Sequence, residues 1–169
     1  MRASFVLTVF LAFAFSAPVL SQEEKSTWKE YRSTANGFAL TVPTLPTPHD
    51  SPAFPGATVY EVPLKADSRV VLRVKKLGHD CSGVISLLKS PSARPVREIS
   101  IEGHPGVEYR WNQSSVSTIL ERWYCVGDRL YVVLVNWPSA QPFPTEATMI
   151  LDSFRLLPKE ANALIIETS

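Results

Sequence analysis

Apolar and polar residues alternate along much of the chain between positions 28 and 137, with the period of half-buried β-strands. Neighbouring segments of this kind are joined by short turn sequences such as Asn36-Gly37 and Gly127-Asp128, so the pattern predicts antiparallel hairpins. The turn between the fifth and sixth segments is expected at residues 103–106. The expected strands cover residues 28–31, 38–42, 57–62, 69–77, 96–102, 107–111, 116–126 and 129–137.

Two segments depart from simple alternation. Residues 129–137 (RLYVVLVNW) are almost continuously apolar, which is typical of a strand buried on both faces, so we expect this strand at the centre of the sheet. Residues 43–63 contain six of the 14 prolines. Because proline donates no backbone hydrogen bond, much of this stretch is expected to be a surface loop.

Two further segments have helical spacing. Asp80 can cap a helix, and Pro144 suits the first turn of another. The apolar positions of the first helix are Cys81, Val84, Ile85 and Leu88, and those of the second are Ala147, Ile150, Leu151 and Phe154. Strands in hairpins together with two helices predict an α+β fold, a mostly antiparallel sheet with helices packed on it.

The first residues have the pattern of an export signal. Arg2 precedes an apolar run from Phe5 to Phe15, which is too short for the ~20 residues that cross a bilayer as a helix. We expect a signal peptide at 1–21 with cleavage after Ser21, a single α+β domain at 22–157 and a flexible tail at 158–169. The protein would then be secreted or periplasmic. An uncleaved anchor is the alternative.

The charges of the chain restrict its partners. The leader contains Arg2, one of the 17 basic residues, so its removal leaves 16 basic against 16 acidic residues. A neutral chain lacks the positive field that attracts nucleic acid or anionic lipid. We therefore expect no nucleic acid as partner, and no membrane span in the mature chain.

Cys81 and Cys125 are the only cysteines. Exported proteins meet oxidising conditions in which paired thiols usually cross-link, so we expect a disulfide between them. Closing a loop of about 45 residues would stabilise the fold by about 4 kcal/mol in the chain-entropy treatment. Two buried, unreactive thiols are the alternative.

The two ends of the pattern resemble a known family. Trp28, Tyr31 and the run 37–43 (GFALTVP), with residues 130–133 (LYVV) and 151–156 (LDSFRL), are similar to the PsbP-like superfamily. The resemblance implies an α/β/α sandwich around an antiparallel sheet. It also implies a non-enzymatic role, because the family comprises extrinsic subunits of the photosynthetic oxygen-evolving complex and assembly factors. No functional residue carries over, since the matching positions are core and turn positions.

Candidate chemistry is sparse. His49, His79 and His104 stand in predicted loops or turns, and their spacing fits no zinc or copper motif, so we expect no metal site. Cys81 at a helix N-terminus could act as a nucleophile, but it shares the inward stripe of its helix, which favours a packed half-cystine. No other catalytic motif is found.

A groove is the remaining candidate. Glu121 and Arg122 fall inside a long strand and point to opposite faces, so each needs a partner or a cleft if both faces are covered. Trp123 and Trp137 are the aromatic residues expected beside them. The aromatic residues of the second half could also form a ligand platform, although core packing is the plainer interpretation. These aromatic residues are Trp111, Trp123, Tyr124, Tyr131 and Trp137.

The sequence thus predicts an exported, non-enzymatic binding or assembly module without a cofactor, whose unknown protein partner lies in the cell envelope or outside the cell. The proline-rich loop and residues 137–143 are the expected contact surfaces. One alternative is a carrier of a small apolar or sugar ligand that uses the strand aromatics. The other is a hydrolase or thiol enzyme that uses His79, Cys81 or Glu121.

Overall fold

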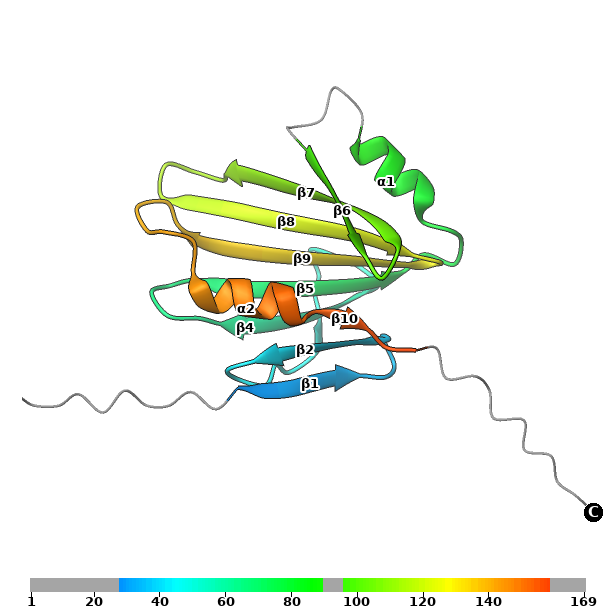
Figure 1. The fold of residues 1–169 in the computed structure, drawn as a ribbon, viewed down its shortest axis with the longest axis horizontal. Helices are drawn as coiled ribbons and strands as arrows, with labels where there is room; N and C mark the ends of the chain where they lie inside the picture. The colour runs from blue at the N-terminus through cyan, green and yellow to red at the C-terminus, as the bar shows by residue number, and fades with distance from the viewer. Residues whose placement is uncertain (1–27, 90–95, 159–169) are drawn as a thin grey trace, which may run out of the picture.

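The computed structural model describes residues 28–89 and 96–158, in which ten strands and two helices follow one another (Figure 1). The helices are α1 (Ser82–Leu88) and α2 (Thr145–Ser153). The strands are β1 (Lys29–Ser33), β2 (Phe38–Val42), β3 (His49–Asp50), β4 (Ala57–Pro63), β5 (Arg69–Lys76), β6 (Val96–Ile101), β7 (His104–Asn112), β8 (Ser117–Val126), β9 (Arg129–Pro138) and β10 (Arg155–Leu156).

Seven strands form one antiparallel sheet in the order β3-β4-β5-β9-β8-β7-β6. β9 lies in the middle, and its residues from Leu130 to Val135 are all buried. The expectation of a central strand buried on both faces is confirmed. The two helices and the mostly antiparallel sheet also confirm the α+β prediction.

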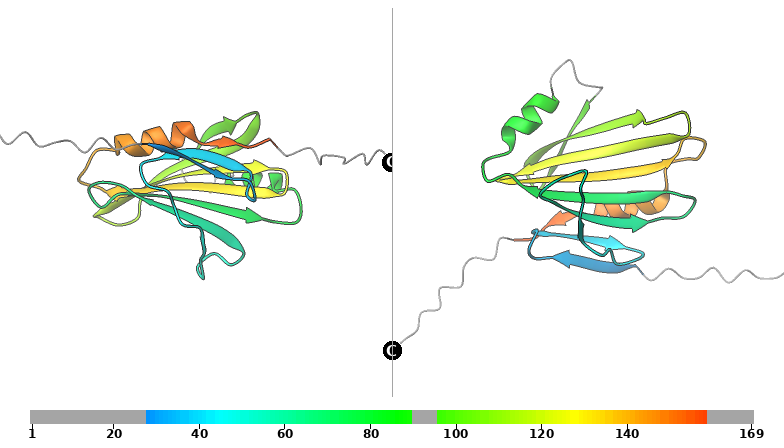
Figure 2. Two further views of the ribbon diagram at one scale, coloured as in Figure 1. Left: turned by 90° about the horizontal axis from the view of Figure 1, so that it is seen from below. Right: turned by 180° about the vertical axis from the view of Figure 1, so that it is seen from behind.

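The second sheet is small and has the order β1-β2-β10. It packs together with α2 on one face of the large sheet, which we call the α2 face (Figure 2). The two sheets are joined by polar contacts as well, because the Tyr60 hydroxyl lies 3.1 Å from Oγ of Ser33 and accepts a 2.6 Å hydrogen bond from Asn36.

Aromatic rings fill the space between the sheets. Phe38 of β2 is fully buried, and its ring contacts Tyr60 and Tyr131 edge to face at 5.0 and 6.5 Å between centroids. The same ring lies 6.0 Å from that of Phe154, which follows α2. Aromatic pairs of this kind stabilise a fold by more than the burial of their apolar area alone. This cluster therefore fixes α2 and the small sheet against the large sheet.

The opposite face, which we call the α1 face, is covered by α1 at one end. Ile85 of α1 packs there against Val107, Tyr109 and the two cysteines. Phe54 of the proline-rich loop reaches the same face farther along, where its ring centroid lies 3.6 Å from Cζ of Arg73. Helices therefore lie on both faces of the sheet, as in an α/β/α sandwich.

One local expectation was wrong. The predicted four-residue turn at 103–106 is a two-residue turn at Glu102 and Gly103, because both adopt positive φ angles of 48° and 82°. His104 is thereby free to begin β7. The proline-rich stretch also contains β3, which pairs with β4. The predicted leader at 1–21 and residues 159–169 of the predicted tail lie outside the described residues.

Candidate functional site

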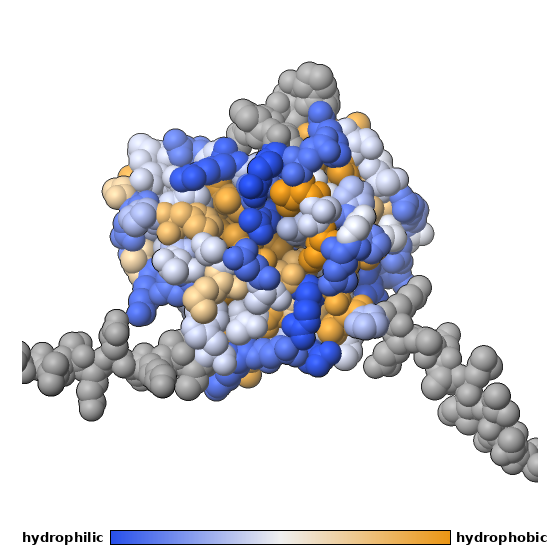
Figure 3. Space-filling view, viewed as in Figure 1, coloured by the Kyte–Doolittle hydropathy of each residue, from blue (hydrophilic) through white to orange (hydrophobic). Residues whose placement is uncertain are grey.

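A groove of about 280 Å³ opens on the α2 face between α2 and strands β6, β7 and β8. Figure 3 shows this face, on which hydrophilic residues border apolar surface. Strand register gathers the charges, because Arg97, Glu108 and Arg122 are direct neighbours across β6, β7 and β8. The lining residues are Arg97, Glu108, Arg110, Leu120, Arg122, Phe143, Thr148, Leu151 and Asp152.

Glu108 is the centre of an ion-pair cluster on the groove wall. Its Oε2 accepts a hydrogen bond of 2.7 Å from Nε of Arg122, and its Oε1 lies 3.0 Å from a guanidinium nitrogen of Arg97. The side chains of Glu108 and Arg122 are only 13% and 18% exposed, whereas that of Arg97 is 66% exposed. The carboxylate is therefore held by two guanidinium groups, one largely buried and one open to solvent.

Arg110 is the third guanidinium group of the groove and has a different environment. Its Cζ lies 5.1 Å from the ring centroid of Trp137, a distance at which a cation is attracted to an aromatic face. Among the described residues no carboxylate lies within ion-pairing distance of Arg110. The ring positions this cation while its donors remain available to a ligand.

The rest of the lining is largely apolar. Phe143 lies in the loop before α2, and its ring meets that of Trp137 edge to face with 5.0 Å between centroids. Leu151 of α2 and Leu120 of β8 complete this part. Oε1 of Glu102 accepts a 3.0 Å hydrogen bond from the backbone of Leu156, which ties the β6–β7 turn to β10, the strand that follows α2. The groove is thus preformed.

The structure divides the four predicted groove residues between the two faces of the sheet. Arg122 lines the groove, and Trp137 is buried beneath Arg110 on the same face. Glu121 and Trp123 lie on the α1 face, where Nε1 of Trp123 donates a 3.1 Å hydrogen bond to Glu121. The two pairs therefore belong to separate environments.

Glu121 has a second neighbour on the α1 face. Burial lowers the pKa of the Arg73 guanidinium, and the negative charge of Glu121 opposes this effect. Arg73 is also covered by the ring of Phe54. Glu121 thus interacts with a cation and with an indole donor, and these two contacts account for a carboxylate inside a strand.

The aromatic residues of the second half are also divided. Tyr124, Tyr131 and Trp137 belong to the core on the α2 face, whereas Trp111 and Trp123 pack on the α1 face. The five rings therefore do not form one platform. A carrier of a small ligand could not use them together.

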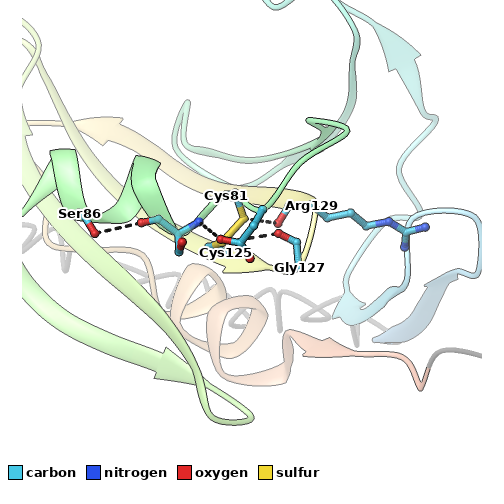
Figure 4. The surroundings of a disulfide bond; sticks show 7 residues. Cys81, Ser86, Cys125, Gly127 and Arg129 are labelled. Carbon is cyan, nitrogen blue, oxygen red and sulfur yellow. Dashed lines mark hydrogen bonds between the residues drawn. A yellow bond between two sulfur atoms is a disulfide. The ribbon is translucent and has the colours of Figure 1, made fainter.

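Cys81 and Cys125 form a disulfide, with 5.5 Å between their Cα atoms (Figure 4). This confirms the predicted pairing. The backbone N–H of Cys81 also donates a 3.0 Å hydrogen bond to the carbonyl oxygen of Gly127, so the start of α1 is fixed to the β8–β9 turn. Asp80 accepts a hydrogen bond from the backbone of Ser82, which holds the first turn of the helix. In this oxidised form Cys81 has no thiol to act as a nucleophile.

The three histidines lie apart, at β3, before α1 and at the start of β7. Within residues 28–89 and 96–158, no three side chains of His, Cys, Asp or Glu converge as ligands of a metal ion would. In the same residues, neither helix has the length and apolar character needed to cross a bilayer.

Sequence reasoning missed Arg97, Glu108 and Arg110 as site residues. Glu108 and Arg110 alternate with Val107 and Tyr109, which is the pattern of any half-exposed strand. Only the pairing of β6, β7 and β8 brings Arg97 and Arg122 to the carboxylate of Glu108, so the local sequence carried no specific signal for this cluster.

No protein-family model matches the sequence, and no curated protein matches it significantly. The fold is similar to the solution structure of cyanobacterial PsbP (CyanoP) from Synechocystis sp. PCC 6803, with a TM-score of 0.52 and 12% identity over 78% of this chain and 93% of that one. A crystal structure from Bacteroides thetaiotaomicron has the same TM-score of 0.52, with 11% identity over 76% of this chain and 48% of that one. This chain thus spans about half the length of the Bacteroides chain. At such identities the likeness concerns the fold alone, and the fold of this chain is PsbP-like.

Proposed function

We propose that the protein is an exported, non-enzymatic binding or assembly module that contacts a partner protein through the groove between α2 and strands β6–β8. The observation that carries this proposal is the preformed groove, in which Arg110 has donors free of any carboxylate among the described residues. Concave surfaces with a few convergent polar groups are the usual places of recognition.

Export is supported by two independent features. The sequence of residues 1–21 has the basic start and short apolar run of a signal peptide. The disulfide fits an oxidising compartment such as the periplasm or the exterior. The PsbP-like fold agrees with a binding or assembly role, although fold likeness alone does not determine function.

The groove favours a protein partner over a small free ligand. Pockets for small molecules usually have volumes of about 300–1,000 Å³ and enclose most of the ligand. The volume of about 280 Å³ lies just below that range. It suits one or two side chains of a bound segment.

The test is site-specific photo-crosslinking in the source organism. A photoreactive phenylalanine analogue replaces Thr148 of α2, which is exposed and lines the groove. The matched control replaces Ser86 of α1, which is exposed on the other side of the sheet. We expect a discrete cross-linked product from position 148 alone, and the substitution Arg110→Glu, at the exposed groove wall, should remove it. Equal labelling from both positions would contradict a specific contact at the groove.

A further inference from the structure

The charges of the groove determine which kind of partner segment it can accept. Its lining contains three arginines and two carboxylates, Glu108 and Asp152. The groove therefore carries a net positive charge, although the basic and acidic residues of the whole chain nearly balance. Glu108 is already held by Arg97 and Arg122. The positive charge open to a ligand is therefore concentrated at Arg110 and the exposed part of Arg97.

Resting on the proposed function, we propose that the groove binds a segment of the partner protein in which an acidic side chain stands next to apolar ones. The carboxylate of that segment pairs with Arg110, and its apolar neighbours pack on Phe143, Leu120 and Leu151. The planar guanidinium presents parallel N–H donors that match the two oxygens of a carboxylate.

The position of Arg110 supports this pairing. Its guanidinium lies over the ring of Trp137, which is 1% exposed, so the ring cannot move away from beneath it. A cation held in one place loses less side-chain entropy when it binds than a free surface arginine does. The apolar lining beside it would gain little from a simple inorganic anion, whereas an acidic and apolar segment uses both halves of the groove.

The negative charge of Asp152 should weaken the binding of an acidic segment. Its removal therefore tests whether the charge of the ligand is negative. It lies at the end of α2, is exposed, and has no ion-pair partner among the described residues. A bound carboxylate would be repelled by Asp152 and attracted by Arg110. Removing the two charges should therefore change the affinity in opposite directions.

The experiment uses two blocked pentapeptides, one alternating leucine with glutamate and the other alternating leucine with glutamine. Their binding to the full mature protein is followed by NMR, from backbone amides and from the arginine Nε–Hε groups. We expect the glutamate peptide to shift the Arg110 side-chain signal and to bind about tenfold more tightly than the glutamine peptide.

Three variants complete the test. Arg110→Gln should reduce binding of the glutamate peptide about tenfold, because the charge-assisted hydrogen bonds are lost. Asp152→Asn should strengthen binding about threefold, by the loss of a like charge near the surface. Arg69→Gln is the control, because Arg69 is an exposed arginine paired with Glu61 on the α1 face, and it should change nothing. The proposal would be overturned if the two peptides, titrated to millimolar concentration, bound with equal affinity. It would also be overturned if the Arg110→Gln variant bound the glutamate peptide as tightly as the unchanged protein does.

Competition separates this inference from the proposed function. If the glutamate peptide suppresses the cross-link from position 148 and the glutamine peptide does not, both are supported. A cross-link that persists in the presence of either peptide overturns the acidic-segment inference and leaves the groove as the contact site. Absence of any cross-link from position 148 overturns the proposed function itself.

Discussion

The Nε of Arg122 donates a hydrogen bond of 2.7 Å to Oε2 of Glu108, directly across the β7–β8 pair. Both side chains are largely buried, so water can replace either partner only in part if the other is removed. The same contact forms part of the groove wall. The ion pair therefore contributes both to the stability of the fold and to the wall of the proposed contact site.

Glu108→Gln should lower the free energy of unfolding by about 2 kcal/mol, because it leaves the largely buried guanidinium of Arg122 without its counter-charge. The control is Glu61→Gln. It removes a carboxylate that pairs with Arg69 on the surface, where the side chains of Glu61 and Arg69 are 42% and 55% exposed. This substitution should lower the free energy of unfolding by less than about 0.5 kcal/mol. Chemical denaturation at neutral pH measures both, and equal losses would show that the Glu108 pair is no more important than a surface pair.

Gly106 should not tolerate a side chain. A Cβ at this position would lie 2.6 Å from the backbone oxygen of Trp123 and 2.6 Å from Cδ1 of Tyr124. Gly106→Ala should therefore destabilise the protein by about 2 kcal/mol through displacement of β8. Gly83→Ala is the matched control, because Gly83 lies within α1 with no atom within 4 Å of its Cβ position, and it should stabilise by about 0.5–1 kcal/mol. If the denaturation midpoints of both variants shifted in the same direction from that of the unchanged protein, this prediction would be contradicted.

The groove could not be predicted because its charges are assembled by strand register. A four-residue turn at 103–106 would place Ile101 opposite Glu108, whereas the two-residue turn at Glu102 and Gly103 places Arg97 there. Register follows from backbone conformation at the turn, and the hydrophobic pattern allows both turns. The sequence of the turn gave no sign that Glu102 adopts a positive φ.

Other features were predictable because they depend on local pattern or on compartment. The apolar run of β9 could only be covered on both sides, and the structure places it at the centre of the large sheet. The disulfide was predicted from two cysteines in a chain whose first residues have the sequence pattern of an export signal. Trp137 shows the limit of such reasoning, because a tryptophan at a strand end fits either a groove or a core.

Reduction of the Cys81–Cys125 disulfide should destabilise the protein by about 2–4 kcal/mol. The loss should be largest locally, because the bond and the Cys81–Gly127 hydrogen bond together fix α1 to the β8–β9 turn. Hydrogen exchange before and after reduction should show faster exchange of α1 amides, with those of β9 still protected. A thiol titration in denaturant should find no reactive thiol before reduction, and two reactive thiols would contradict the bond.

The protein should lose stability above about pH 10, and buried tyrosines are a specific cause. Burial raises the pKa of Tyr124 and of Tyr131 above the ordinary value of 10.0. As the pH rises, the unfolded chain releases these phenolic protons before the folded chain does, and this favours unfolding. The contribution is fully present below pH 10 and is lost as the pH rises through the folded-state values.

The free energy of unfolding measured by urea denaturation between pH 8 and 11 tests this. A double variant, Tyr124→Phe with Tyr131→Phe, should be less stable at pH 8, because Tyr131 loses its 2.8 Å hydrogen bond to the carbonyl oxygen of Asn36. Its stability should nevertheless fall less steeply above pH 10 than that of the unchanged protein. If both proteins show the same slope, the alkaline loss comes from other groups, and the burial of these two rings contributes nothing to it.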